Sequence, residues 1–262
     1  MDIVLTSIPL QVDDPTNLYN DGKEKEYTWE FLYYNFTLAN SWSPFLVNHS
    51  VENDIYKIHL DQPDMAWSLP FANYDVAIIS TGYWYFRPSI YYMNNTILGS
   101  NPRSGLNLTQ FDMLPAMKIA LGTVLRHMVD KFNGITIMRT ITVPHFENGS
   151  WGNGGSCNRT QPYADTDMKM PLPWMSNAMY NIQMEEYMKV MVIKDGLMPP
   201  RLKLLDVTYS ALLRPDGHPG PYRIQKPNEP VNDCLHWCLP GPIDMWSQLL
   251  TETIKPYFYH LA

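Results

Sequence analysis

The chain has 262 residues, which is long enough for one large domain with a substantial core. Its formal net charge is −7 and it contains no block of lysine or arginine, which argues against nucleic acid or an anionic membrane as a partner. Aromatic residues make up 13% of the chain, so a packed core with ordered loops is expected and disorder is not.

The first part of the chain divides into a lead-in and a strand-like segment. Residues 1–26 are polar and rich in turn residues, which predicts an irregular lead-in to a single domain over residues 27–262. From Tyr27 to Leu38 aromatic residues recur at alternating positions, a pattern typical of β-strands, and Pro44 ends the segment.

The rest of the chain alternates between short apolar runs and longer helical patterns. The apolar runs predict strands buried on both faces, as in a parallel sheet, at 73–80, 135–143 and 202–207. Helical spacing predicts three long helices, at 111–132, 176–194 and 243–254. Strands that alternate with long helices indicate an α/β fold with a parallel sheet, and no internal repeat or linker divides it.

Asp233 and His236 are the candidate catalytic pair. Residues three apart can share a face of a turn, so the carboxylate can hold one imidazole nitrogen while the other faces a substrate, as in serine hydrolases. The spacing alone is common, and most such pairs are structural. A base also needs a nucleophile, and no serine of the chain lies in a recognisable activating motif.

The three cysteines allow two interpretations. A disulfide from Cys157 to Cys234 or Cys238 would close a loop of roughly 80 residues, worth about 4–5 kcal/mol in the chain-entropy treatment. It would also fasten the glycine-rich loop 149–155 against the loop of the candidate pair. The alternative is a zinc site that uses the three cysteines and His236. Spacings of one residue are unlike those of structural zinc sites, so no metal is expected.

A second group of candidates concerns the oxyanion and the substrate. Gly82 follows the first buried strand, where ligands bind in open α/β sheets, and its N–H can stabilise an oxyanion. Trp84 is interpreted either as a platform for a sugar ring or as core, and Phe86 as core. His145 and His218 lie in turn-rich loops and are candidates for ligand contacts, although a structural role is the simpler interpretation for each.

Two further motifs bear on ligand binding and on the cellular compartment. The glycine-rich loop lacks Gly-Lys-Ser/Thr, so phosphate binding is rejected. The sequon Asn-x-Ser/Thr occurs more often than the two or three copies that chance gives, which indicates a glycosylated, lumenal protein unless it is a coincidence of asparagine content. The six asparagines are Asn35, Asn48, Asn94, Asn107, Asn148 and Asn158.

The targeting signals do not match the sequons. Residues 1–6 have no basic region and too short an apolar stretch for a signal peptide, and no run of about 18 apolar residues predicts a membrane span. We therefore expect the chain to descend from a longer secretory protein that has lost its N-terminal part.

Several strings, in this order, resemble the plant trichome-birefringence-like proteins of the PC-esterase group in the SGNH/GDSL hydrolase superfamily. The match covers about residues 27–254, and its most specific string is Asp233-Cys234-Leu235-His236-Trp237-Cys238-Leu239-Pro240-Gly241. The other strings are Tyr34-Asn35-Phe36-Thr37, Trp42-Ser43-Pro44-Phe45-Leu46-Val47, Ser80-Thr81-Gly82-Tyr83-Trp84, His145-Phe146-Glu147, Gly154-Gly155-Ser156-Cys157 and Leu213-Arg214-Pro215-Asp216-Gly217-His218-Pro219. The stretch from Tyr83 to Pro88, with His145-Phe146-Glu147, is most similar to the branch that acetylates xyloglucan.

The resemblance implies a three-layer α/β/α SGNH-like fold, Golgi residence and O-acetyl transfer onto cell-wall polysaccharide without a cofactor. Its partners would be the polysaccharide acceptor and an acetyl donor, or a membrane protein that supplies the donor. The family's Asp-x-x-His motif falls on Asp233 and His236, and its serine lies in an upstream Gly-Asp-Ser. In that scheme His236 takes the serine proton, an acetyl-serine forms, and a sugar hydroxyl activated by His236 accepts the acetyl group.

The chain departs from the family pattern in three places. It contains no Gly-Asp-Ser, no N-terminal membrane anchor, and no further cysteines at residues 98–102, which predicts one lost disulfide and a looser loop. We therefore expect a truncated xyloglucan-type O-acetyltransferase that is inactive as an isolated chain. The alternatives are a non-catalytic glycan-binding pseudoenzyme and a carbohydrate acetylesterase.

Overall fold

The computed structural model describes residues 26–31, 33, 36–151, 153–164, 170–192, 201–222 and 232–258. Except for Glu26, the predicted lead-in lies outside the described residues, and so does the sequon at Asn35.

A parallel sheet of three strands forms the centre of the fold. Its strands are β5 (Val76–Ile79), β8 (Ile135–Arg139) and β9 (Leu202–Leu205), in the order β5-β8-β9. Every residue of the middle strand β8 is buried, as expected for a strand covered on both faces. The three strands predicted from the apolar runs are thus confirmed, although β8 ends four residues before the predicted limit of 143.

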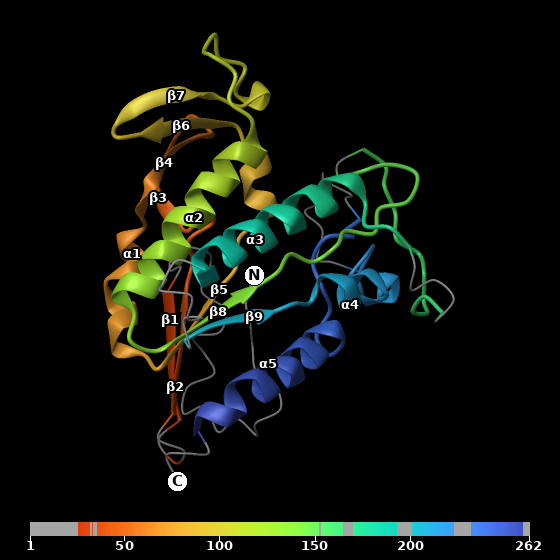
Figure 1. Cartoon of the computed structure of the whole chain (residues 1–262). Coiled ribbons are helices and arrows are strands. Elements are labelled where there is room, and N and C mark those ends of the chain that lie inside the picture. The colour runs from red at the N-terminus through yellow and green to blue at the C-terminus, as the bar shows by residue number, and fades with distance from the viewer. Residues whose placement is uncertain are drawn as a thin grey trace.

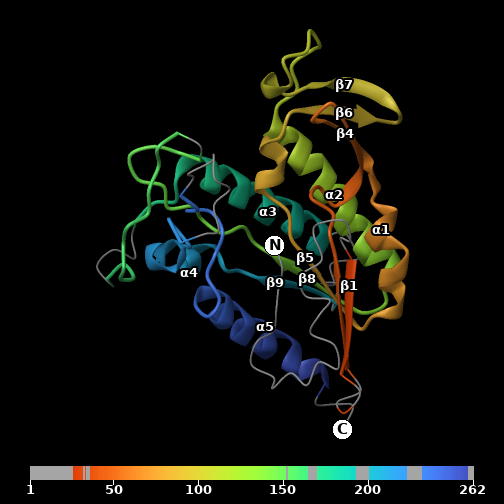
Figure 2. The same cartoon turned by 180° about the vertical axis from the view of Figure 1, so that it is seen from behind.

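Three long helices cover the two faces of this sheet. The helices α2 (Met113–Lys131) and α3 (Trp174–Val192) lie on one face, and α5 (Pro242–Phe258) lies on the other (Figures 1 and 2). The side chains of the strands alternate between two cores. Met138 packs in the cluster on the side of α2, whereas its neighbour Ile137 packs with residues of α5. The arrangement is the α/β/α architecture expected from the sequence.

A second sheet of four strands lies next to α2 and was not predicted. Its order is β3-β4-β6-β7, in which β4 and β6 are parallel and the two outer pairs are antiparallel hairpins. The strands are β3 (Val47–Glu52), β4 (Ile55–Pro63), β6 (Ser89–Met93) and β7 (Thr96–Ser100). The hairpins turn at Asn53-Asp54 and Asn94-Asn95, all four with positive φ, which is the two-residue turn that suits the twist of β-hairpins.

The remaining elements are short. The aromatic segment predicted as strand-like forms an antiparallel hairpin of β1 (Glu26–Phe31) and β2 (Phe36–Ser41). Single helical turns occur at α1 (Met65–Ser68) and α4 (Thr208–Leu212), with 3₁₀ turns at Pro70–Asn73, Tyr83–Phe86, Pro102–Ser104 and Pro215–Gly217. Within the described ranges, no helix has both the length and the apolar character that crossing a membrane requires.

Candidate functional site

The loop before α5 holds Asp233 and His236 in direct contact. The Nδ1 atom of His236 lies 2.8 Å from Oδ2 and 3.0 Å from Oδ1 of Asp233. The same Oδ1 accepts the backbone N–H groups of Leu235 and His236 at 3.2 and 2.9 Å, so one carboxylate shapes the turn and orients the ring. The Asp233 side chain is 1% exposed, whereas the His236 side chain is 50% exposed.

The electrostatics of the pair determine which nitrogen is available. Burial opposes the charge on Asp233, but hydrogen bonds from the ring and backbone of His236 outweigh it and hold the pKa of Asp233 well below its usual range. The carboxylate is therefore ionised near neutrality and accepts the Nδ1–H of His236. In the neutral ring the lone pair then lies on Nε2, which has no hydrogen-bond partner among the described residues. This half-exposed ring can act as a base toward a hydroxyl group.

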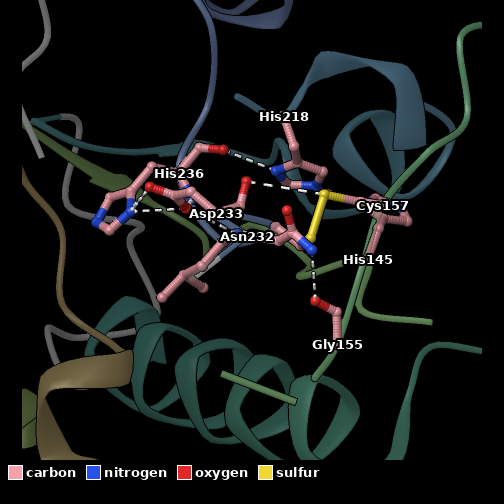
Figure 3. The surroundings of a disulfide bond; sticks show 9 residues. His145, Gly155, Cys157, His218, Asn232, Asp233 and His236 are labelled. Atoms are coloured by element: carbon pink, nitrogen blue, oxygen red, sulfur yellow. Dashed lines mark hydrogen bonds and ion pairs between the residues drawn. A yellow bond between two sulfur atoms is a disulfide. The ribbon is translucent and has the colours of Figure 1, made fainter. Parts of the chain in front are cut away.

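A disulfide joins this loop to the glycine-rich loop. Of the two pairings that the sequence left open, the structure contains Cys157–Cys234 (Figure 3). Cys238 is a free thiol. In Figure 3, Asp233 lies between His236 on one side and the disulfide on the other, and the Nδ2 of Asn232 donates to the carbonyl of Gly155. The zinc interpretation loses two of its four ligands, because cysteines in a disulfide supply no thiolate.

The glycine-rich loop brings an aromatic ring to the candidate base. Trp151, which is 46% exposed, lies edge-on to His236, with ring centroids 6.0 Å apart. The glycines around it permit a tight loop: a Cβ on Gly149 would lie 2.3 Å from the carbonyl oxygen of Asn153. The sequence analysis expected a disulfide to bring these two loops together but assigned no role to Trp151, whose contact with His236 is seen only in the structure.

His145 and His218 do not present free nitrogens. The Nε2 of His145 lies 2.9 Å from the carbonyl oxygen of Leu212, and its Nδ1 lies 2.7 Å from Nε2 of His218. The Nδ1 of His218 lies 2.7 Å from the carbonyl oxygen of His236. Both nitrogens of each ring thus have protein partners, and the prediction that these rings contact a ligand gains no support from this geometry.

Gly82 and Trp84 lie at the end of β5, as expected, but they are packed against protein. A Cβ on Gly82 would lie 3.1 Å from Cγ2 of Ile141 and 3.7 Å from Cε of Met179, and no atom of His236 is within 4 Å of it. The oxyanion role of Gly82 therefore stays a prediction. The ring of Trp84 is edge-on to Trp42 at 5.3 Å, with the Arg87 guanidinium 5.0 Å from its centroid, which favours the core interpretation.

Gln183 of α3 was missed by the sequence analysis and holds two strand ends together. Its side chain is buried, accepts the N–H of Ile141 at 2.9 Å and donates to the carbonyl of Thr81 at 3.2 Å. Ile141 follows β8 and Thr81 precedes Gly82, so one side-chain amide holds the two segments in place relative to each other. A lone glutamine in a methionine-rich helix carries no sequence signal for this role.

Comparison with known proteins gives a consistent result. Residues 5–253 match the PC-Esterase family, described as a GDSL/SGNH-like acyl-esterase family found in Pmr5 and Cas1p. Protein trichome birefringence-like 25 of Arabidopsis thaliana is 38% identical over 95% of the chain and 58% of its own length. Xyloglucan O-acetyltransferase 1 of Populus trichocarpa is 36% identical over 94% of the chain and 60% of its own length. The Arabidopsis thaliana protein named xyloglucan O-acetyltransferase 1 is 33% identical over 93% of the chain and 58% of its own length. The chain therefore spans less than two thirds of the length of these relatives.

Proposed function

Because the chain belongs to the PC-esterase family, we propose that it takes part in O-acetyl transfer onto a plant cell-wall polysaccharide of the xyloglucan type. The relatives named xyloglucan O-acetyltransferase support the substrate class. The observation that carries the proposal is the contact of 2.8 Å between His236 Nδ1 and the buried carboxylate of Asp233. In this proposal His236 is the general base and Asp233 orients it.

The chemistry that the pair supplies is proton transfer during acyl exchange. The Nε2 of His236 takes the proton of an attacking hydroxyl as its oxygen bonds to the acetyl carbonyl carbon. The imidazolium, stabilised by Asp233, then returns the proton to the oxygen that leaves when the bond to the acetyl group breaks. The 262 residues contain no Gly-Asp-Ser, so the pair has no nucleophile of the family type within this chain, and we propose that the chain alone does not turn over.

The setting of this activity is proposed to be the Golgi lumen. Four of the sequon asparagines, Asn94, Asn107, Asn148 and Asn158, are exposed, which suits glycosylation. The disulfide between Cys157 and Cys234 suits an oxidising compartment. The partners in this proposal are the polysaccharide acceptor and an acetyl donor or the membrane protein that delivers it.

Two measurements on the purified chain test the proposal. Calorimetric titration with a xyloglucan oligosaccharide should show binding, and mass spectrometry with an acetyl donor should show no transfer by the chain alone. Robust transfer that His236→Ala abolishes would mean that the chain has a nucleophile outside the Gly-Asp-Ser motif and would contradict the inactivity proposed here. Absence of any binding would contradict the proposed substrate class.

The pseudoenzyme alternative is favoured by one observation, the missing Gly-Asp-Ser. A pseudoenzyme would also bind the xyloglucan oligosaccharide, so binding does not separate the two hypotheses. The experiment that separates them restores a nucleophile. A longer protein that joins a Gly-Asp-Ser segment of a relative to this chain should transfer acetyl groups and lose that activity in His236→Ala. A fusion that binds the oligosaccharide but transfers nothing would favour the pseudoenzyme. Acetate release without transfer would favour the esterase.

A further inference from the structure

A continuous line of hydrogen bonds runs from the end of α4 to the backbone of the candidate base. It begins at the carbonyl of Leu212, passes through the rings of His145 and His218, and ends at the carbonyl of His236. The three contacts measure 2.9, 2.7 and 2.7 Å. We call this line the histidine relay. His218 is 8% exposed, and its ring packs against Trp237 in a tilted arrangement with centroids 4.0 Å apart, so water does not substitute freely for these contacts.

The protons needed by the relay can be counted. Each end of the line is a carbonyl oxygen, which only accepts, so His145 must carry a proton on Nε2 and His218 a proton on Nδ1. The middle contact joins Nδ1 of His145 to Nε2 of His218 and needs a proton on one of them. Three N–H groups are therefore required, whereas two neutral imidazoles supply two. The complete relay is an imidazole paired with an imidazolium.

The surroundings assign the extra proton to His145. Burial lowers the pKa of His218 to about 4, and the neighbouring rings of His145 and His236 add to that shift against the carboxylate of Asp233 and the carbonyl of His236. His218 is therefore the neutral partner in the complete relay, where its single proton lies on Nδ1.

His145 lies among opposing influences. Its pKa is lowered, chiefly by burial and also by Arg159, although the Leu212 carbonyl and the carboxylates of Asp216 and Glu147 raise it. His145 is thus the ring that gains or loses the third proton.

We propose that His145 and His218 are positioning residues that together hold the backbone carbonyl of His236, and with it the loop that carries the candidate base. Other backbone contacts already fix the flanks of this loop: Asp233 exchanges two hydrogen bonds with Gly220, and the N–H of Cys238 donates to the carbonyl of Gly217. Between these flanks, the N–H of His145 donates to the carbonyl of Cys234, which the disulfide also holds. The relay adds a contact at His236, the residue whose ring performs the chemistry.

The contact between His218 and the His236 carbonyl depends on the number of protons that the two rings carry. A neutral pair satisfies only two of the three contacts, and once the His236 carbonyl is released, two protons are enough for the two contacts that remain. Closure of the loop on the relay therefore binds a proton, and acidification strengthens closure. The inference rests on the proposed function only in naming His236 as the base.

The test measures amide hydrogen exchange of residues 235 and 236 and the ring nitrogens by ¹⁵N NMR, on the full chain, between about pH 7.5 and about pH 5. The parent for exchange is His236→Gln, which removes the titration of that ring but keeps the carbonyl that the relay holds. In the unsubstituted chain the pKa of Asp233 lies well below this range, but the ring of His236 is a main cause of that depression, so the Asp233 carboxyl is followed in the same titration of the His236→Gln parent. In this parent, protection corrected for intrinsic exchange should rise as the pH falls.

Two substitutions at His218 separate positioning from general stability. His218→Asn keeps an amide donor for the carbonyl at position 236 at every pH, so protection should persist and lose its pH dependence. His218→Leu removes the donor, so the rise in acid should disappear, and near pH 5 protection should be about tenfold below that of the parent, the equivalent of one net hydrogen bond. The control His127→Asn removes a histidine of α2 outside the relay and should leave the protection unchanged.

The ring spectra of the unsubstituted chain provide the second readout. In acid, His145 should carry protons on both nitrogens while His218 carries one, on Nδ1. The relay is excluded if both rings keep a single proton over the whole range, or if His218→Leu retains the protection and pH slope of its parent. Since no turnover is measured, either failure leaves the acetyl-transfer experiment unaffected, and a negative transfer result leaves the relay standing.

Discussion

Removal of the Cys157–Cys234 disulfide is the perturbation whose magnitude follows most directly from the structure. The two cysteines are 77 residues apart in sequence, and closing a loop of this length removes about 4.5 kcal/mol of chain entropy from the unfolded state at 25 °C. The double variant Cys157→Ala/Cys234→Ala should therefore lower the free energy of unfolding by about 4 kcal/mol. It should also raise the dependence of that free energy on urea, because the unfolded chain becomes less compact.

Urea denaturation followed by tryptophan fluorescence measures both quantities. The matched control is Cys238→Ala, which removes the half-buried free thiol and should cost about 1 kcal/mol or less. The same double variant should lose the edge-on contact between Trp151 and His236, since the disulfide ties their two loops together. A double variant no less stable than the Cys238→Ala control would refute the claim that the disulfide restrains these loops.

Three further predictions concern the candidate pair and its support. Because the pKa of Asp233 is depressed in the folded chain, its contribution to stability is present above the unfolded value of about 4 and is lost as the pH falls below it. In urea titrations, the free energy of unfolding should fall less steeply between about pH 5 and pH 2 in Asp233→Asn than in the unsubstituted chain. An equally steep fall in both would argue against the ion pair. Gln183→Leu leaves two buried backbone groups unpaired and should lower the free energy of unfolding by about 2–3 kcal/mol. The control Gln248→Leu, at an exposed position of α5, should lower it by less than about 0.5 kcal/mol, and equal losses would contradict the bridging role of Gln183. The slow hydrolysis of p-nitrophenyl acetate, an activated ester that an exposed imidazole cleaves without the family serine, should fall at least several-fold in His236→Ala and hardly at all in His49→Gln. The reverse order would locate the reactive imidazole elsewhere.

The sequence predicted those parts of the fold that follow from local pattern. The strands β5, β8 and β9 were found because their apolar residues face helices on both sides, which produces an uninterrupted run. The second sheet was missed because an uninterrupted apolar run does not occur in β4, where Lys57, His59 and Asp61 alternate with the buried Ile58 and Leu60. The available signals were this alternation and the turn at Asn53-Asp54, where two residues that tolerate positive φ stand between the paired strands.

The candidate site shows the same division between local and long-range information. The contact of Asp233 with His236 was predictable because three residues of chain bring the groups together. The contact of His145 with His218 was not, because 73 residues separate them and only the fold makes them neighbours. The choice of Cys234 over Cys238 as the partner of Cys157 likewise depends on the path of the loop, which cysteine spacing does not encode.

The central claim is tested most directly by the tautomer of His236 in its neutral form, read by ¹⁵N NMR. We expect hydrogen on Nδ1 and a bare Nε2, and Asp233→Ala should weaken that preference. Hydrogen on Nε2 in the unsubstituted chain would contradict it, because a base oriented by Asp233 must keep Nε2 free to accept a proton.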